Sequence, residues 1–193
     1  MSEKPERSPA QVARAIADAF EAAGVPYAIG GAIAFGIWAL PRATKDVDVT
    51  AFVTGEALES ALNALGAAGV TIDAGAARRS ATERGDFVGW ADAMRVDVFV
   101  PSIPFYREAE QRRRSVPFLG RPMQVLSAED LAVFKLIFFR PKDVLDLERL
   151  LVIMRESLDV AYVRKSLVQV VGPDDQRVTT WDELVAAAAQ STS

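Results

Sequence analysis

The chain has 193 residues, 50% of them apolar, and a formal net charge of −4. This length allows one domain with a substantial hydrophobic core. The chain contains no cysteine and no histidine, which excludes disulfides, thiolate nucleophiles, Ser-His-Asp hydrolases and the usual zinc sites. Any catalysis must therefore use carboxylates, lysine, arginine, hydroxyls or a hard cation held by oxygen ligands.

Composition also bears on the location and the partners of the protein. No apolar run is long enough to cross a bilayer, and residues 1–8 are polar and mixed in charge, unlike a signal peptide. We therefore expect a cytoplasmic protein with no membrane partner. The mildly acidic balance argues against nucleic-acid binding by net charge alone, and it leaves room for a local basic patch.

The first half of the chain predicts alternating helices and strands. Ser8 can cap a helix that begins at Pro9, and Gly24 can end it. In chain order we expect a helix over residues 9–24, a strand over 27–29, a helix over 32–40, a strand over 46–52 and a helix from Thr54 to about residue 65. Residues 70–86 show little periodicity and predict a mixture of strand and loop.

The second half begins with strands and continues with helices. We expect strands over residues 87–90 and 94–100, an exit loop at Pro101 and Pro104, and a hairpin over residues 116–126. From Ser127 onward, capping patterns predict four helices, which begin after Ser127, at Pro141, after Asp159 and after Thr180. The predicted fold class is α/β (α+β), with a small mixed sheet flanked by helices over residues 1–126 and a helical region over 127–193.

Three aspartates are the candidate site. Residues two apart on a strand point to one face, so Asp46 and Asp48 lie side by side, and Asp97 lies on a second apolar strand. If the two strands are neighbours, Asp97 comes within reach of the first pair. A divalent cation would neutralise the repulsion, and carboxylates without histidine suit Mg²⁺ or Mn²⁺. The alternative is that Asp-x-Asp is the solvent face of an amphipathic strand.

A glycine turn precedes the first pair. Gly30 and Gly31 end a strand and enter a helix, where open backbone N–H groups can hold a phosphate. Taken alone, this pattern is also that of an ordinary strand-to-helix turn.

Together, Ile29-Gly30-Gly31, the run Arg42-Ala-Thr44-Lys-Asp46-Val-Asp48 and the strand around Asp97 resemble the DNA polymerase β-type nucleotidyltransferase superfamily. The Arg-x-Thr lead-in is similar to the small bacterial branch that contains toxin-type and antibiotic-modifying enzymes. Lys135 and the Lys142-Asp143 pair resemble a downstream element of the toxin-type members. The likeness covers residues 27–151 and implies a polymerase β-like core.

This resemblance implies a function and a set of roles. Asp46 and Asp48 would hold two metals, and Asp97 would complete the second site and help to deprotonate the attacking hydroxyl. The glycines would approach the phosphates of an NTP by their backbone. The other residues that the resemblance places near the nucleotide are Arg42, Thr44, Lys45, Lys135 and Lys142.

These basic residues each have a second interpretation. Arg42 and Lys45 are equally compatible with a solvated surface, and Lys135 can lay its stem on the core with its amine directed outward. Lys142 can be a first-turn charge of the helix after Pro141. The basic run 111–114 predicts a solvated helix end, with acceptor binding as the alternative. Three tryptophans predict core or capping positions: Trp38, Trp90 and Trp181.

The leading hypothesis is a metal-dependent nucleotidyltransferase that moves NMP from an NTP, such as ATP, to a hydroxyl. The acceptor is left open among an RNA such as tRNA, a protein and a small molecule, and by resemblance a toxin with a cognate antitoxin is included. The alternatives are a non-catalytic nucleotide-binding module, an aminoglycoside-type nucleotidyltransferase and a carboxylate-metal nuclease.

Overall fold

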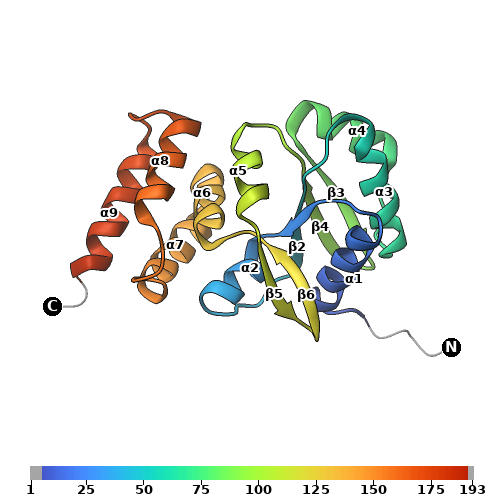
Figure 1. The fold of residues 1–193 in the computed structure, drawn as a ribbon, viewed down its shortest axis with the longest axis horizontal. Helices are drawn as coiled ribbons and strands as arrows, with labels where there is room; N and C mark the ends of the chain where they lie inside the picture. Colours follow the sequence, from blue (N-terminus) through green and yellow to red (C-terminus); the bar gives the residue numbers. More distant parts are fainter. Residues whose placement is uncertain (1–5, 191–193) are drawn as a thin grey trace. The chain divides into compact units, whose positions relative to one another are not determined.

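The computed structural model describes residues 6–190, so the first five residues of the predicted polar N-terminal stretch lie outside it. Within this range the fold is mixed α/β, as predicted, with one six-stranded sheet and nine α-helices (Figure 1). The strands are β1 (Tyr27–Ile29), β2 (Asp46–Ala51), β3 (Asp86–Ala91), β4 (Met94–Phe99), β5 (Arg114–Phe118) and β6 (Arg121–Val125).

The helices both flank the sheet and follow it along the chain. They are α1 (Pro9–Ala22), α2 (Gly31–Trp38), the 3-10 helix η1 (Gly55–Ala57), α3 (Leu58–Ala67), α4 (Ala74–Arg84), α5 (Phe105–Arg112), α6 (Ala128–Phe138), α7 (Pro141–Ile153), α8 (Val160–Val171) and α9 (Gln176–Gln190). No helix among the described residues is long and apolar enough to span a membrane.

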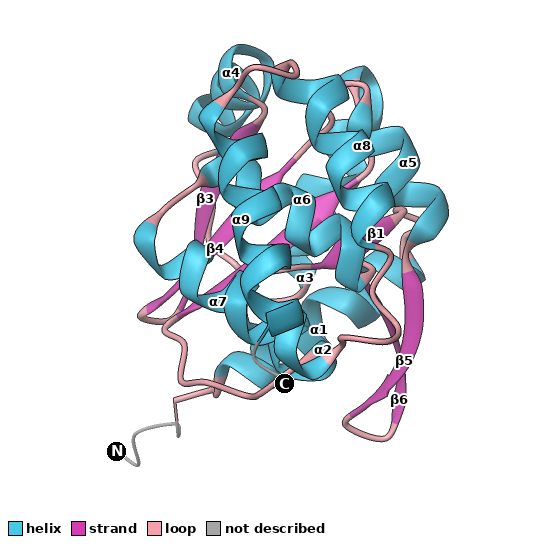
Figure 2. Cartoon of the chain, turned by 90° about the vertical axis from the view of Figure 1, so that its left-hand side faces the viewer, coloured by secondary structure: helices cyan, strands magenta, loops and turns pink. Residues whose placement is uncertain are grey.

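By their contacts the residues form two compact units. The first unit holds the sheet and consists of the chain up to Ile33 together with Ala43–Leu126. The second consists of Ala34–Arg42 and the chain from Ser127 onward. It is helix and loop only within the described residues (Figure 2). The division into two domains at residue 126 stays a prediction, and the grouping of Ala34–Arg42 with the C-terminal helices was not foreseen.

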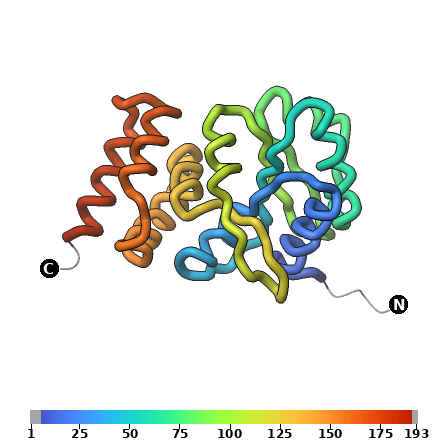
Figure 3. Tube along the Cα trace, viewed as in Figure 1, coloured from blue at the N-terminus to red at the C-terminus, as the bar shows by residue number. Residues whose placement is uncertain are grey.

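The sheet of the first unit has the order β3-β4-β2-β1-β6-β5. β2 pairs with β4 and β1 pairs with β6 in parallel, and the other neighbouring pairs are antiparallel. Figure 3 traces the crossover that brings the blue segment of β1 beside the yellow strand β6. β2 and β4, which carry the three predicted acids, are therefore central strands of the sheet.

One face of the central strands forms the core of this unit. Val47, Val49, Val96 and Val98 are fully buried, and α1 packs against β1, β2 and α3. The capping box of α1 is present as predicted, because Ser8 and the third helical residue exchange side-chain and backbone hydrogen bonds. The apolar residues at every second strand position thus leave the opposite face for polar groups.

Two predicted elements are wrong. Residues 74–84 are a helix, α4, rather than strand and loop, with Asp73 as its N-cap and Gly85 as a left-handed C-cap. Only Ala77 of this helix is buried, so it lacks the apolar stripe on which a helix prediction depends. The last helix begins at Gln176, four residues before the predicted cap Thr180, which lies inside α9.

The second unit has its own core. α6 packs on α7 and α8, and α9 packs on all three. Trp181 is almost fully buried, as predicted, and its indole N–H donates to the Val160 carbonyl at 3.3 Å. Ser127 caps α6 by accepting from the backbone N–H of Asp130 at 3.1 Å, which confirms the cap predicted there.

Tyr27 supplies a pH-dependent contribution to the stability of the first unit. Burial and the hydrogen bond that its hydroxyl donates to Glu21 at 2.6 Å raise the pKa of Tyr27 to about 12. Between pH 10 and 12 the unfolded chain loses this proton before the folded protein does, so the free energy of unfolding should fall over that range. Urea unfolding at pH 9, 10 and 11 should show this fall, and Tyr27→Phe should lessen it. Tyr106, whose pKa burial also raises to about 12, accounts for the remainder. Equal slopes for both proteins would contradict the assignment.

Candidate active site

The three predicted acids lie on the side of β2 and β4 opposite the buried valines. The parallel register pairs Asp48 with Asp97 and Asp46 with Arg95. Paired residues on adjacent strands have their Cα atoms roughly 5 Å apart, and alternation directs their side chains to one face. The requirement that the two acidic strands be neighbours is therefore met. We call the surface formed by Asp46, Asp48, Arg95 and Asp97 the acid face.

Arg95 is the member of the acid face that sequence reasoning missed. Its Nε donates to the two carboxylate oxygens of Asp97 at 2.9 and 3.0 Å, and its NH2 group donates to Oδ1 at 2.7 Å. These hydrogen bonds, with the attraction of Asp97, Asp46 and Asp86, raise the pKa of Arg95. The guanidinium therefore neutralises part of the charge of three carboxylates gathered on one face.

The acid face fits a divalent cation in its donor set and in its backbone placement. Three carboxylates suit Mg²⁺ or Mn²⁺, and the register brings Asp97 beside Asp48. However, nowhere in residues 6–190 do three or more acids converge closely enough to hold a metal, and the Asp97 carboxylate is paired with Arg95. Metal binding by Asp97 stays a prediction, and it would require the carboxylate to leave Arg95.

Thr44 orients the first acid. Its hydroxyl hydrogen-bonds to the Asp46 carboxylate, and it also reaches the Asp46 carbonyl at 3.3 Å. The Thr of the Arg-x-Thr motif therefore contacts the site through Asp46. The side chains of Lys45 and Lys142 are exposed, and contact of these lysines with a nucleotide stays a prediction.

The glycine turn abuts the second acid. Gly30 donates its backbone N–H to the Asp48 carbonyl at 2.9 Å, so that group belongs to the sheet and cannot bind a phosphate as predicted. Gly31 has a φ of +53° and begins α2, where the first N–H groups of a helix lack partners within the helix. A phosphate role therefore stays a prediction for Gly31 only.

A buried cluster of charges lies in the second unit. Lys135, which is 4% exposed, donates to Asp146 at 2.7 Å and to Asp143 at 3.5 Å. Arg42 reaches the same Asp146 oxygen at 3.1 Å. Arg140 donates to Asp143 through Nε at 2.6 Å. Burial opposes the ionised form of Asp143, but the hydrogen bond from Arg140 and the charge of Lys135 outweigh it and lower its pKa.

This cluster changes how two predicted nucleotide contacts are understood. The amine of Lys135 is directed to buried carboxylates, not outward along the surface. Arg42 is paired with Asp146 and is not a solvated surface charge. Contact of either residue with a triphosphate stays a prediction, and it would require them to exchange these partners.

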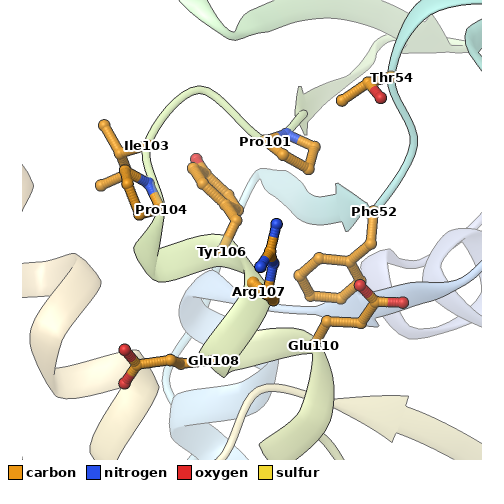
Figure 4. A pocket seen from close by; sticks show the side chains of 9 residues that line it. All are labelled: Phe52, Thr54, Pro101, Ile103, Pro104, Tyr106, Arg107, Glu108 and Glu110. Atoms are coloured by element: carbon orange, nitrogen blue, oxygen red, sulfur yellow. The ribbon is translucent and has the colours of Figure 1, made fainter.

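A separate hollow lies at the other end of the central strands. It has a volume of about 590 Å³ and is lined by Phe52, Thr54, Pro101, Ile103, Pro104, Tyr106, Arg107, Glu108 and Glu110 (Figure 4). Phe52 follows the last residue of β2, whereas Asp46 is the first residue of that strand. Six residues of strand span roughly 20 Å, so this hollow does not belong to the acid face.

Neither a family model nor a curated protein sequence matches the chain. Solved structures do resemble it. A candidate nucleotidyltransferase from H. pylori has a TM-score of 0.52 at 17% identity, over 98% of this chain and 95% of its own. An antigenic nucleotidyltransferase-like protein from Paracoccidioides brasiliensis has a TM-score of 0.51 at 16% identity, over 90% and 93% of the two chains.

A third structure, ANT(2")-Ia in complex with adenylyl-2"-tobramycin, has a TM-score of 0.50 at 15% identity, over 95% of this chain and 98% of its own. The chain has the nucleotidyltransferase fold. The fold that the motifs predicted is thus confirmed. At these identities the likeness shows the fold alone, and any chemistry of this chain depends on its own residues.

Substitution of Gly31 should damage this core. A Cβ at residue 31 would lie 1.7 Å from Oδ2 of Asp48, and the positive φ adds backbone strain. We expect Gly31→Ala to displace the Asp48 carboxylate and to lower the free energy of unfolding by clearly more than Gly24→Ala. Gly24 also has a positive φ, +65°, but open space around it, so its variant should cost only about 1–2 kcal/mol. Urea unfolding measures both, and equal losses would refute the close approach.

Loss of the buried amine should destabilise the second unit. Lys135→Met leaves Asp143 and Asp146 without their shared cation, and breaking a buried pair typically costs about 3–5 kcal/mol. Lys165→Met, at an exposed lysine of α8, should change the free energy of unfolding by less than about 0.5 kcal/mol. Chemical denaturation of both variants compares them, and similar stabilities would show that the cluster adds little.

Proposed function

We propose that the chain is a metal-dependent nucleotidyltransferase that transfers NMP from an NTP to a hydroxyl group. The observation that carries this proposal is the parallel register of β2 and β4, which sets Asp97 beside Asp48 on the face shared with Asp46. The fold supports it, because the acids, each partly exposed, lie on strands inside the sheet of a nucleotidyltransferase fold.

The chain's own residues have separable tasks in this reaction. Asp46, oriented by the Thr44 hydroxyl, and Asp48, packed against Gly31, would hold Mg²⁺ or Mn²⁺, with Asp97 as the third ligand. A bound divalent cation supplies polarisation of the α-phosphate and stabilises the charge on the leaving pyrophosphate. In the proposed step the acceptor oxygen bonds to the α-phosphorus, the bond to pyrophosphate breaks, and the Asp97 carboxylate takes the hydroxyl proton.

Before it can act as a ligand or as a base, Asp97 has to leave Arg95. The ion pair has three N–O distances between 2.7 and 3.0 Å, but the Arg95 side chain is 50% exposed. The Asp97 side chain is only 20% exposed, and a bidentate Arg–carboxylate pair is stronger than an ordinary surface ion pair. A bound cation would therefore have to offset the loss of this pair when Asp97 turns toward Asp48.

The acceptor is a separate question. The acceptor hydroxyl can belong to an RNA, a protein or a small molecule. Because the structure of ANT(2")-Ia contains adenylyl-2"-tobramycin, an acceptor screen should include small molecules. A toxin with a cognate antitoxin remains part of the proposal by the resemblance of the motifs.

Removal of either metal ligand should abolish transfer. With each labelled NTP, Mg²⁺ and a panel of RNAs, cell proteins and small hydroxylated compounds, wild type should transfer label, and Asp46→Asn and Asp48→Asn should lose it by about 100-fold or more. Asp92→Asn is the matched control, because Asp92 lies on the exposed turn between β3 and β4. It should retain wild-type transfer.

Label transfer that survives both substitutions would remove the assigned site. Label transfer absent from wild type, with NTP binding intact in calorimetry, would favour the non-catalytic nucleotide-binding alternative.

A further inference from the structure

The acid face continues onto an exposed aromatic ring. Trp90 of β3 is in register with Arg95 of β4, which is in register with Asp46 of β2. The three residues form one row across three strands, so the Cα atoms of Trp90 and Asp46 are roughly 10 Å apart. Trp90 is 48% exposed, which corrects the prediction that it is a core or capping aromatic.

The backbone of Trp90 is held firmly at the edge of the sheet. Its N–H donates to the Thr71 carbonyl at 2.9 Å, and its carbonyl accepts from the Thr71 N–H at 2.7 Å. Because these groups point away from β4, Trp90 and Arg95 form a non-hydrogen-bonded pair, the type in which cross-strand side chains are closest. Gly89, on the opposite face of β3, leaves room for Val70 and Ile72 to pack there. The backbone of Trp90 is therefore fixed, and its side chain is partly open to solvent.

Arg95 retains donor capacity beside this ring. Asp97 accepts hydrogen bonds from the Nε and Nη2 groups of Arg95. The Nη1 group of Arg95 makes no hydrogen bond within the described part of the chain. A guanidinium has five N–H donors in a planar fork, and it binds phosphate oxygens well. The row thus presents, in order from the edge of the sheet, an open indole face, a cation with donors to spare and a metal-binding carboxylate.

We propose that Trp90 and Arg95 form a nucleotide-binding subsite beside the acids, in which Trp90 stacks on a base and Arg95 binds a phosphate of the same nucleotide. Stacking on aromatic rings next to a basic group is the general way in which proteins hold single nucleotides without reading their sequence. The nucleotide is either the NTP donor or the terminal nucleotide of an RNA acceptor. The inference deepens the proposed function and rests on it for the assignment of the neighbouring acids.

The chemistry of the row favours this ligand over a cationic one. A polyamine or an amino sugar would be attracted by the three carboxylates of the acid face, but it would meet the guanidinium of Arg95 before it reached the ring of Trp90. A nucleotide offers a flat ring for Trp90 and an anion for Arg95, its neighbour in the strand register. The exposed indole of Trp90 offers a planar, largely apolar face to such a ligand.

Calorimetric titration of the full chain tests this assignment. Wild type is titrated in Mg²⁺ buffer with ATP and, separately, with a five-nucleotide oligoribonucleotide. We expect Trp90→Leu to raise Kd for one of the two by about tenfold or more, which is the effect of losing one aromatic–base stack. Trp90→Phe, which keeps a ring, should recover part of that loss. An effect on ATP assigns the donor to the subsite, and an effect on the oligonucleotide assigns the acceptor.

Matched controls separate the subsite from general surface effects. Leu119 is another exposed apolar residue of the first unit, 58% accessible, and Leu119→Ala should leave both Kd values unchanged. Arg84 pairs with Asp86 two residues later, as Arg95 pairs with Asp97. Arg95→Gln should therefore weaken the same ligand that Trp90→Leu weakens and reduce the salt dependence of its binding, whereas Arg84→Gln should not.

The outcomes also distinguish this inference from the proposed function. Unchanged Kd values in Trp90→Leu for both ligands, or equal affinities of the Leu and Phe variants, would overturn the subsite even if wild type transfers nucleotides. If Asp46→Asn binds the ligand with a Trp90-dependent Kd but wild type transfers no label, the subsite stands and the catalytic proposal fails.

Discussion

The parallel pairing of β2 with β4 is the constraint on which the candidate site depends. Side chains alternate along a strand, so a slip of one residue in this register would carry valines to the acid face and aspartates into the core. Val47, Val49, Val96 and Val98 are fully buried, and their burial opposes such a slip because each would lose roughly 1.5–3 kcal/mol on exposure. The hydrophobic core therefore sets the spacing of the acids.

Sequence reasoning recovered the parts of this arrangement that local patterns encode. The alternation around Asp48 and Asp97 predicted their face, but it could not say where the long side chain of Arg95 would point. Helix α4 was missed because a surface helix with one buried alanine has no apolar period. The contact of Gly31 with Asp48 depends on a tertiary approach, and the exposure of Trp90 depends on which strand forms the edge of the sheet.

The buried charges of the second unit are each stabilised by a close partner of opposite charge. Lys135, Asp143 and Asp146 are each no more than 4% exposed, and the cost of removing three charges from water is offset only where each has a close partner. Arg42 completes the set, and it lies four residues before Asp46 in the chain. Within the first unit, Thr44 orients the Asp46 carboxylate by a hydrogen bond.

Arg95 has opposing effects on the chemistry of the acid face. Three carboxylates on neighbouring positions repel one another, and the guanidinium relieves that repulsion when no cation is bound. The same ion pair would compete with a divalent cation for Asp97, so it would reduce metal affinity by whatever the pair contributes. The Arg95 side chain is 50% exposed and that of Asp97 only 20%, so solvent screens the pair from one side only. A metal-bound nucleotide would bring phosphates beside Arg95, and the guanidinium would then exchange one anion for another at little cost.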